Sequence, residues 1–135
     1  MTAPDALTIV VTDEAPAAIG PYSQGTVAGS MLFSAGQIPL DPVSMDIVGT
    51  SMEEQAEQVM KNLDAVVRAA GSSLANVIKT TCFLTDLSDF QIFNTVYGNW
   101  FGDHKPARST VQVAKLPRGV LVEVECVALV PQSAY

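Results

Sequence analysis

The C-terminal part of the chain alternates between two kinds of side chain, and this pattern restricts the possible folds more than any other feature. Every second position is small and apolar: Val120, Val122, Val124, Cys126 and Ala128. The positions between them hold Leu121, Glu123, Glu125, Val127 and Leu129. Because the side chains of a strand point alternately to its two faces, residues 119–130 are predicted to form a strand. One of its faces belongs to a core, and the other mixes carboxylates with large apolar groups.

The segment before this strand is interpreted as its hairpin partner. Residues 107–114 are expected to pair with it in antiparallel register, which places Thr110 opposite Glu123 and Arg108 opposite Glu125. In this register the arginine and the two glutamates share one face of the sheet.

The same hairpin assigns Val111 and Val113 to the core, and Gln112 to the charged face beside Arg108. A face that mixes an arginine, two glutamates and large apolar residues is unlike a solvated strand face, so it indicates a buried interface. Two interpretations stay open. The charges form a site at that interface, or they form a cross-strand ion pair that only holds two subunits together.

The other elements follow from apolar periodicity and turn residues. They are strand 7–11, a turn at 18–22, the hairpin of 24–29 and 31–38, a loop over 39–50, helix 51–70, strand 77–85 and helix 88–101. Ser51 and Glu54 form a capping-box pattern at the start of the first helix, and Gly71 ends it. This order predicts an α+β fold with two helices on one face of a mixed sheet. The chain of 135 residues is expected to form a single domain over 1–135, with a core from about 8 to 130.

The balance of charges argues against nucleic acid as the main partner. The chain carries 7 Lys+Arg and 14 Asp+Glu, a formal net charge of −7, whereas binding to phosphates needs a basic face. The first basic residue is Lys61, which speaks against an Arg-rich transit peptide or a signal peptide with a basic start. No apolar run approaches the roughly 20 residues of a membrane-spanning helix. We therefore expect no membrane segment.

Cys82 and Cys126 lie far apart and match no metal-binding spacing, and His104 is the single histidine. We expect two buried, reduced thiols, a cytoplasmic setting and no metal site.

Four separated blocks of the sequence resemble signatures of the RidA (YjgF) reactive-intermediate deaminase family, whose members also carry the label endoribonuclease L-PSP. They run in the family's order from about residue 8 to residue 130. The blocks are residues 17–25 (AAIGPYSQG), 34–39 (SAGQIP), 86–97 with Asn94 and Tyr97, and 106–125 with PARSTV, AKLP and VEVE.

The resemblance implies a chorismate-mutase-like fold packed as a homotrimer, with active clefts between neighbouring subunits. The implied reaction is the hydrolysis of 2-imino acids such as 2-iminobutanoate and 2-iminopropanoate, or of their enamine tautomers, to 2-oxo acids and ammonia. PLP-dependent dehydratases acting on Thr or Ser produce these intermediates, and their removal protects other PLP enzymes. The reaction needs no cofactor.

The resemblance also implies roles for particular residues. Arg108 matches the arginine that binds the substrate carboxylate, and a guanidinium suits this role because its planar fork makes two parallel hydrogen bonds. Glu123 matches the glutamate that positions or activates water. Tyr22 matches a residue of the cleft wall, and Gly36 matches a glycine whose backbone lies against the substrate. Four further positions belong to the same expected site: Ala35, Asn94, Ser109 and Thr110.

Two departures from the family pattern bear on substrate preference. Thr110 stands where many members have cysteine. The family's mechanism does not require a thiol nucleophile, because the backbone at this position contacts the substrate, so we expect activity to be retained. Ala35 stands where some members have serine, which removes one hydroxyl contact.

Two other functions compete with the deaminase. An RNA-cleaving or translation-inhibiting protein is disfavoured by the negative charge and by the lack of a histidine pair for acid–base cleavage. A non-catalytic trimer that binds small carboxylates or acts as a chaperone explains Arg108 but leaves Glu123 without a role.

Overall fold

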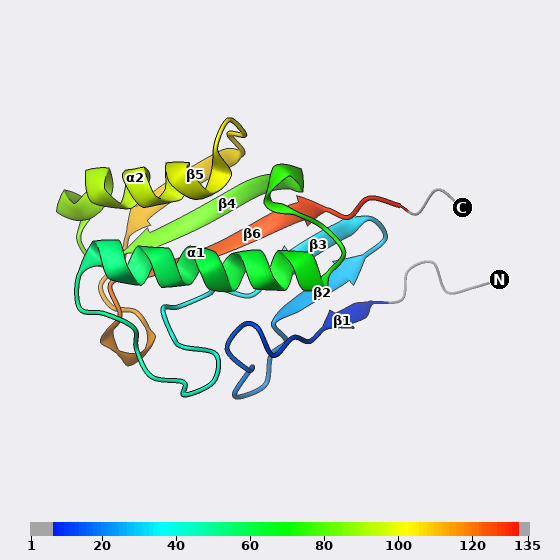
Figure 1. The fold of residues 1–135 in the computed structure, drawn as a ribbon, viewed down its shortest axis with the longest axis horizontal. Helices are drawn as coiled ribbons and strands as arrows, with labels where there is room; N and C mark the ends of the chain where they lie inside the picture. The colour runs from blue at the N-terminus through cyan, green and yellow to red at the C-terminus, as the bar shows by residue number, and fades with distance from the viewer. Residues whose placement is uncertain (1–6, 133–135) are drawn as a thin grey trace.

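Six strands form one mixed sheet, and two helices cover one of its faces (Figure 1). The computed structural model describes residues 7–132. The strands are β1 (Thr8–Val10), β2 (Gly25–Ala28), β3 (Met31–Ser34), β4 (Val77–Leu84), β5 (Ala107–Gln112) and β6 (Val122–Leu129). The helices are α1 (Met52–Ala69) and α2 (Phe90–Phe101). This arrangement confirms the predicted α+β fold with both helices on one side of the sheet.

The strand order β1-β2-β3-β6-β4-β5 contradicts the predicted C-terminal hairpin. β6 lies between β3 and β4 and is antiparallel to both, while β5 pairs in parallel with β4 at the edge of the sheet. The physical reason is the connection through α2, because a helical crossover returns the chain parallel to the strand it left. β6 is apolar at alternate positions throughout and takes the central place instead.

The corrected pairing changes which residues share a face. Arg108 lies opposite Thr80, and Thr110 lies opposite Cys82. Both of these β4 residues are fully buried on the helix-covered side, so Arg108 and Thr110 point to that side as well. Val111 consequently points to the other side and is exposed, so its predicted place in the core is wrong.

The core face of β6 is confirmed. Its small apolar residues are buried, namely Val122, Val124, Cys126 and Ala128. They pack in one cluster with the apolar stripe of α1, which includes Val59, Leu63 and Val66. Among residues 7–132, neither helix is long and apolar enough to cross a membrane.

Helix α1 begins where the sequence predicts. The Ser51 side chain accepts a hydrogen bond from the Glu54 N–H, and the Glu54 carboxylate accepts one from the Ser51 N–H, which completes the capping box. After the last turn of the helix, Gly71 adopts a φ of 85°, a left-handed conformation that other residues reach only with strain.

A buried asparagine ties α1 to the loop that follows β3. Asn62 is fully buried, and its Nδ2 donates to the carbonyl oxygens of Ile38 at 3.1 Å and Leu40 at 2.9 Å. Its Oδ1 accepts a hydrogen bond from Gln58 at 2.9 Å. These bonds hold the segment around Ile38 against the helix.

We expect Asn62→Ala to lower the free energy of unfolding by about 1–3 kcal/mol, because two buried carbonyl oxygens lose their donors. Lys61→Ala, at the exposed neighbouring position, is the matched control and should change it by less than about 0.5 kcal/mol. Urea unfolding followed by circular dichroism measures both. Equal midpoints for the two variants would contradict a structural role for the Asn62 amide.

Candidate functional site

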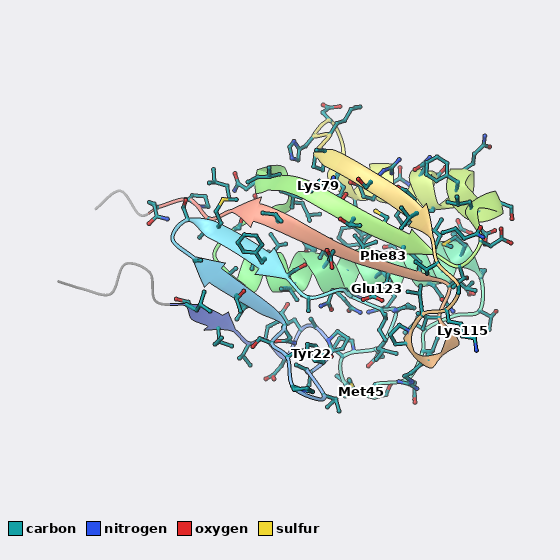
Figure 2. All side chains as sticks on the ribbon, turned by 180° about the vertical axis from the view of Figure 1, so that it is seen from behind. Tyr22, Met45, Lys79, Phe83, Lys115 and Glu123 are labelled. Carbon is teal, nitrogen blue, oxygen red and sulfur yellow. The ribbon has the colours of Figure 1, made fainter. Side chains whose placement is uncertain are left out.

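Glu123 lies on β6, on the sheet face that the helices leave open (Figure 2). It is half-buried at a hollow of about 460 Å³, named here the Glu123 hollow. The other lining residues are Ile19, Tyr22, Ala35, Gly36, Ile38 and Pro117. Because most of these groups are apolar, the carboxylate lies where water is partly excluded.

The surroundings raise the pKa of Glu123 above its usual value. The larger cause is burial, which removes water from the carboxylate, and the smaller cause is the negative charge of Glu125 on the same face. Among residues 7–132, no Lys, Arg or His forms an ion pair with Glu123. A carboxyl group with a raised pKa exchanges a proton closer to neutral pH, as a general base or acid requires.

Gly36 makes room for this carboxylate. The Gln37 N–H donates to the Val124 carbonyl oxygen at 2.8 Å, and the Val124 N–H donates back to the Gln37 carbonyl oxygen at 3.1 Å. This bridge brings the chain at position 36 against β6. A Cβ at Gly36 would overlap the Glu123 carboxylate and lie 2.8 Å from its Cδ. The family resemblance implies a contact between this glycine and the substrate, and the structure gives a separate reason for a glycine here, which is space for Glu123.

We expect Gly36→Ala to lower the free energy of unfolding by about 0.5–1.5 kcal/mol, because Glu123 must turn into a less favourable side-chain conformation. In a Glu123→Ala background the same substitution should cost less than about 0.5 kcal/mol, since the space is then free. Urea unfolding of the complete double-mutant cycle measures the difference. The same cost in both backgrounds would show that Gly36 does not accommodate Glu123.

Arg108 is held by side chains of α2. Its Nη1 donates to Oδ1 of Asn94 at 2.8 Å. Its guanidinium carbon lies 5.4 Å from the ring centre of Phe90 and 4.8 Å from that of Tyr97. No carboxylate among the described residues forms an ion pair with it. The guanidinium is therefore positioned by one amide and two rings, and it retains the charge and donors that a carboxylate ligand needs.

The two rings are not among the site residues expected from the sequence. Tyr97 also belongs to the buried core cluster, so its ring serves both the core and the guanidinium. The spacing carried a signal. Residues three and four apart lie on one side of a helix, so Phe90, Asn94 and Tyr97 had to share a side with one another. Because Asn94 was already a candidate, its two aromatic neighbours were candidates too.

Within one chain, Arg108 and Glu123 do not meet. Arg108 points to the helix-covered side of β5, and Glu123 points to the open side of β6, with β4 between these strands. The expectation that the arginine and both glutamates share a face is therefore wrong. The reason is the parallel pairing of β5, which places Arg108 beside the buried Thr80.

The other candidate residues divide between these two places. Tyr22, Ala35 and Gly36 line the Glu123 hollow. Thr110 lines a shallow hollow of about 390 Å³ beside Arg108, and its buried Oγ1 has no hydrogen-bond partner among the described residues. Ser109 lines neither hollow, and its hydroxyl accepts a hydrogen bond from Lys79 Nζ at 3.0 Å.

Both cysteines are free and buried, as predicted. Burial raises the pKa of the Cys82 thiol and of the Cys126 thiol to about 11, so neither is a thiolate at neutral pH. Among residues 7–132, no three His, Cys, Asp or Glu side chains gather in a way that could hold a metal ion.

Known proteins are similar to this chain in sequence and in fold. The family model described as Endoribonuclease L-PSP matches residues 12–130. A RutC family protein of Synechocystis is 51% identical over 125 residues, which covers 91% of this chain and 96% of that protein. The Reactive Intermediate Deaminase A, chloroplastic, of Arabidopsis thaliana is 44% identical over 120 residues, covering 89% of this chain and 64% of that protein.

The crystal structure of Escherichia coli TdcF with bound serine superposes with a TM-score of 0.87 at 45% identity, covering 93% of this chain and 99% of that one. The six-stranded mixed sheet with two helices on one face is thus shared with TdcF. The chain belongs to the Rid family, which is also called the YjgF, RutC or L-PSP family. The family resemblance found in the sequence is confirmed.

Proposed function

We propose that this protein is a deaminase that hydrolyses reactive 2-imino acids, such as 2-iminobutanoate and 2-iminopropanoate, and their enamine tautomers. The products are 2-oxo acids and ammonia, and their formation protects PLP enzymes from the imines. The name of the Arabidopsis relative supports the reaction class. The observation that carries the proposal is the pair of complementary groups, an arginine that forms an ion pair with no carboxylate among residues 7–132 and a glutamate with a raised pKa.

The active site is proposed to form between subunits of a homotrimer. Arg108 and Glu123 point to opposite sides of the sheet, so one substrate can touch both only if they come from different copies. The open sheet face also carries exposed apolar side chains that a neighbouring subunit would cover, namely Ile9, Phe33, Val111 and Leu129. In a closed ring of identical subunits, every copy supplies Arg108 to one cleft and Glu123 to another.

The reaction needs one anion-binding group and one group that moves a proton. Arg108 binds the substrate carboxylate through parallel N–H groups, while Asn94 and the two rings hold the guanidinium in place. Glu123 accepts a proton from the water that attacks the C=N carbon. It passes this proton to the imine nitrogen, which gives a carbinolamine. It then takes the hydroxyl proton of the carbinolamine and passes it to the same nitrogen, so that ammonia leaves as the C–N bond breaks and the C=O bond forms.

We expect Glu123→Gln to lower turnover roughly 10²–10⁴-fold while carboxylate binding is retained, because the base is lost and the shape is kept. Arg108→Ala should lose most of the activity, since a bidentate anchor worth roughly 2–4 kcal/mol is removed. Arg108→Lys should not restore it, because a point charge cannot reproduce the fork. The measurement is 2-oxo acid release from imines generated in situ.

The mass of each variant is measured by light scattering on the same samples, because both positions lie where subunits are proposed to meet. A trimeric Glu123→Gln protein with wild-type turnover would contradict the mechanism.

Mixing the two variants provides a sharper control. Equal amounts of Arg108→Ala and Glu123→Gln chains, unfolded and refolded together, should restore about one quarter of the sites. A site is intact when its Arg108 comes from a Glu123→Gln chain and its Glu123 comes from an Arg108→Ala chain, and each of these is met in about half of the cases. No recovery from the mixture would contradict a site shared between subunits.

The raised pKa of Glu123 predicts a particular pH dependence. The base acts in its deprotonated form, so kcat/KM falls as pH drops below this pKa. Glu125→Gln removes the smaller of the two causes that raise it, so the acid limb of the profile should move to lower pH. Glu53→Gln, an exposed carboxyl on α1, is the control and should leave the limb in place. An unchanged limb in Glu125→Gln would contradict the assignment of Glu123 as the base.

A second candidate function is the binding of small carboxylates without catalysis. The crystal structure of TdcF with bound serine favours it, because serine carries a carboxylate that an arginine such as Arg108 can bind. The two functions differ at Glu123. A pure binding protein does not accelerate imine hydrolysis and tolerates Glu123→Gln. The deaminase accelerates the hydrolysis and loses this activity in Glu123→Gln.

A further inference from the structure

A second hollow of about 470 Å³ continues from the Glu123 hollow. The two share five lining residues, which are Ile19, Tyr22, Gly36, Ile38 and Pro117. Beyond this shared wall the second hollow extends to Ala17, Leu40, Met45 and Arg118. Tyr22 and Met45 both lie below Glu123 in Figure 2, at the side of the sheet where the loops gather. A group bound at Glu123 can therefore reach into the second hollow without a change of the fold.

The lining of the second hollow is mainly apolar, and apart from Tyr22 its polar side chains are Gln24, Gln37 and Arg118. The Gln24 side chain lines it, but its Nε2 donates to the carbonyl oxygens of Thr12 at 3.0 Å and Pro16 at 2.8 Å. Its Oε1 accepts a hydrogen bond from the Thr12 N–H at 2.8 Å. The amide is thus used to hold the neighbouring loop, and the wall it leaves is mainly aliphatic.

The outer wall of the hollow carries unusual backbone conformations. Met45 has a φ of 64° and Arg118 a φ of 58°, and they are the non-glycine residues with positive φ among those described. Arg118 Nη1 donates to the Met45 carbonyl oxygen at 2.6 Å. Positive φ is unfavourable for residues with a Cβ. Two such residues, joined by a hydrogen bond at the rim of one hollow, therefore indicate that this part of the hollow has a function.

We propose that the second hollow binds the side chain of the substrate, and that Met45 and Arg118 set the length of side chain it accepts. This proposal rests on the proposed function and defines its substrate class, which is 2-imino acids with extended apolar side chains. A methyl side chain leaves the second hollow empty, whereas a leucine-sized side chain fills part of it and loses contact with water. One methylene in an apolar pocket changes kcat/KM by roughly 10- to 200-fold.

The test compares imines derived from alanine, leucine and glutamate, each generated in situ by an amino acid oxidase with catalase present. We expect kcat/KM for the leucine imine to exceed that for the alanine imine by at least about tenfold. A preference for the glutamate imine would overturn the proposal, because Arg118 would then bind a second carboxylate. Equal kcat/KM for the leucine and alanine imines would overturn it as well.

Variants of the wall test the assignment of the hollow. Ala17→Phe places a ring in the second hollow from a position that does not line the Glu123 hollow. It should lower the leucine-to-alanine ratio at least about tenfold. Met45→Gly removes the side chain and suits the positive φ, so it should raise the relative rate with a phenylalanine imine. Val43→Phe is the matched control. It adds the same ring to a side chain that is 90% exposed, and the ratio should not change.

Binding of the product acids separates failure of this proposal from failure of the proposed function. Isothermal titration with pyruvate and 4-methyl-2-oxopentanoate needs no turnover. Tighter binding of the longer acid, lost in Ala17→Phe, supports the side-chain pocket even if no imine is hydrolysed, and in that case only the deaminase function fails. If imines are hydrolysed and Ala17→Phe leaves the leucine-to-alanine ratio of kcat/KM unchanged, the pocket is overturned and the deaminase function stays intact. An unchanged preference in binding of the product acids overturns the pocket as well.

Discussion

The burial of β6 between β3 and β4 is the constraint on which the rest of this structure depends. Its alternate residues pack into the core beneath α1, so the residues between them must point to the other side of the sheet. Glu123 is therefore held on the open face by the same packing that stabilises the fold. A shift of the strand by one residue would put a carboxylate into the core, which the cost of burying an unpaired charge prevents.

The loop after β3 turns this placement into a chemical environment. The two hydrogen bonds between Gln37 and Val124 bring the chain against β6, and Gly36 leaves the space that the carboxylate occupies. Asn62 of α1 holds the continuation of the loop at Ile38, which is part of the hollow wall. The raised pKa of Glu123 is thus a consequence of how the loops pack over the open face, since they place apolar residues around its carboxylate.

The arginine half of the site depends on a different part of the fold. The crossover through α2 makes β5 an edge strand, and it places Asn94 and two aromatic rings around the guanidinium of Arg108. These two halves lie on opposite sides of one sheet. A site that uses both halves on one substrate consequently requires a second copy of the chain, and this links the proposed chemistry directly to assembly.

The sequence by itself determined the element types, the core face of β6, the capped start of α1 and the family, because these follow from local periodicity, capping residues and short motifs. Strand order and the placement of Arg108 were decided only by the tertiary structure. Alternation shows that Arg108 and Thr110 share a face, but it does not show which strand pairs with β5. That pairing depends on contacts between residues distant in the chain, here the crossover through α2 and the apolar residues that draw β6 to the centre. The positive φ of Met45 and Arg118 has the same origin, since their contact joins two loops that no local pattern connects.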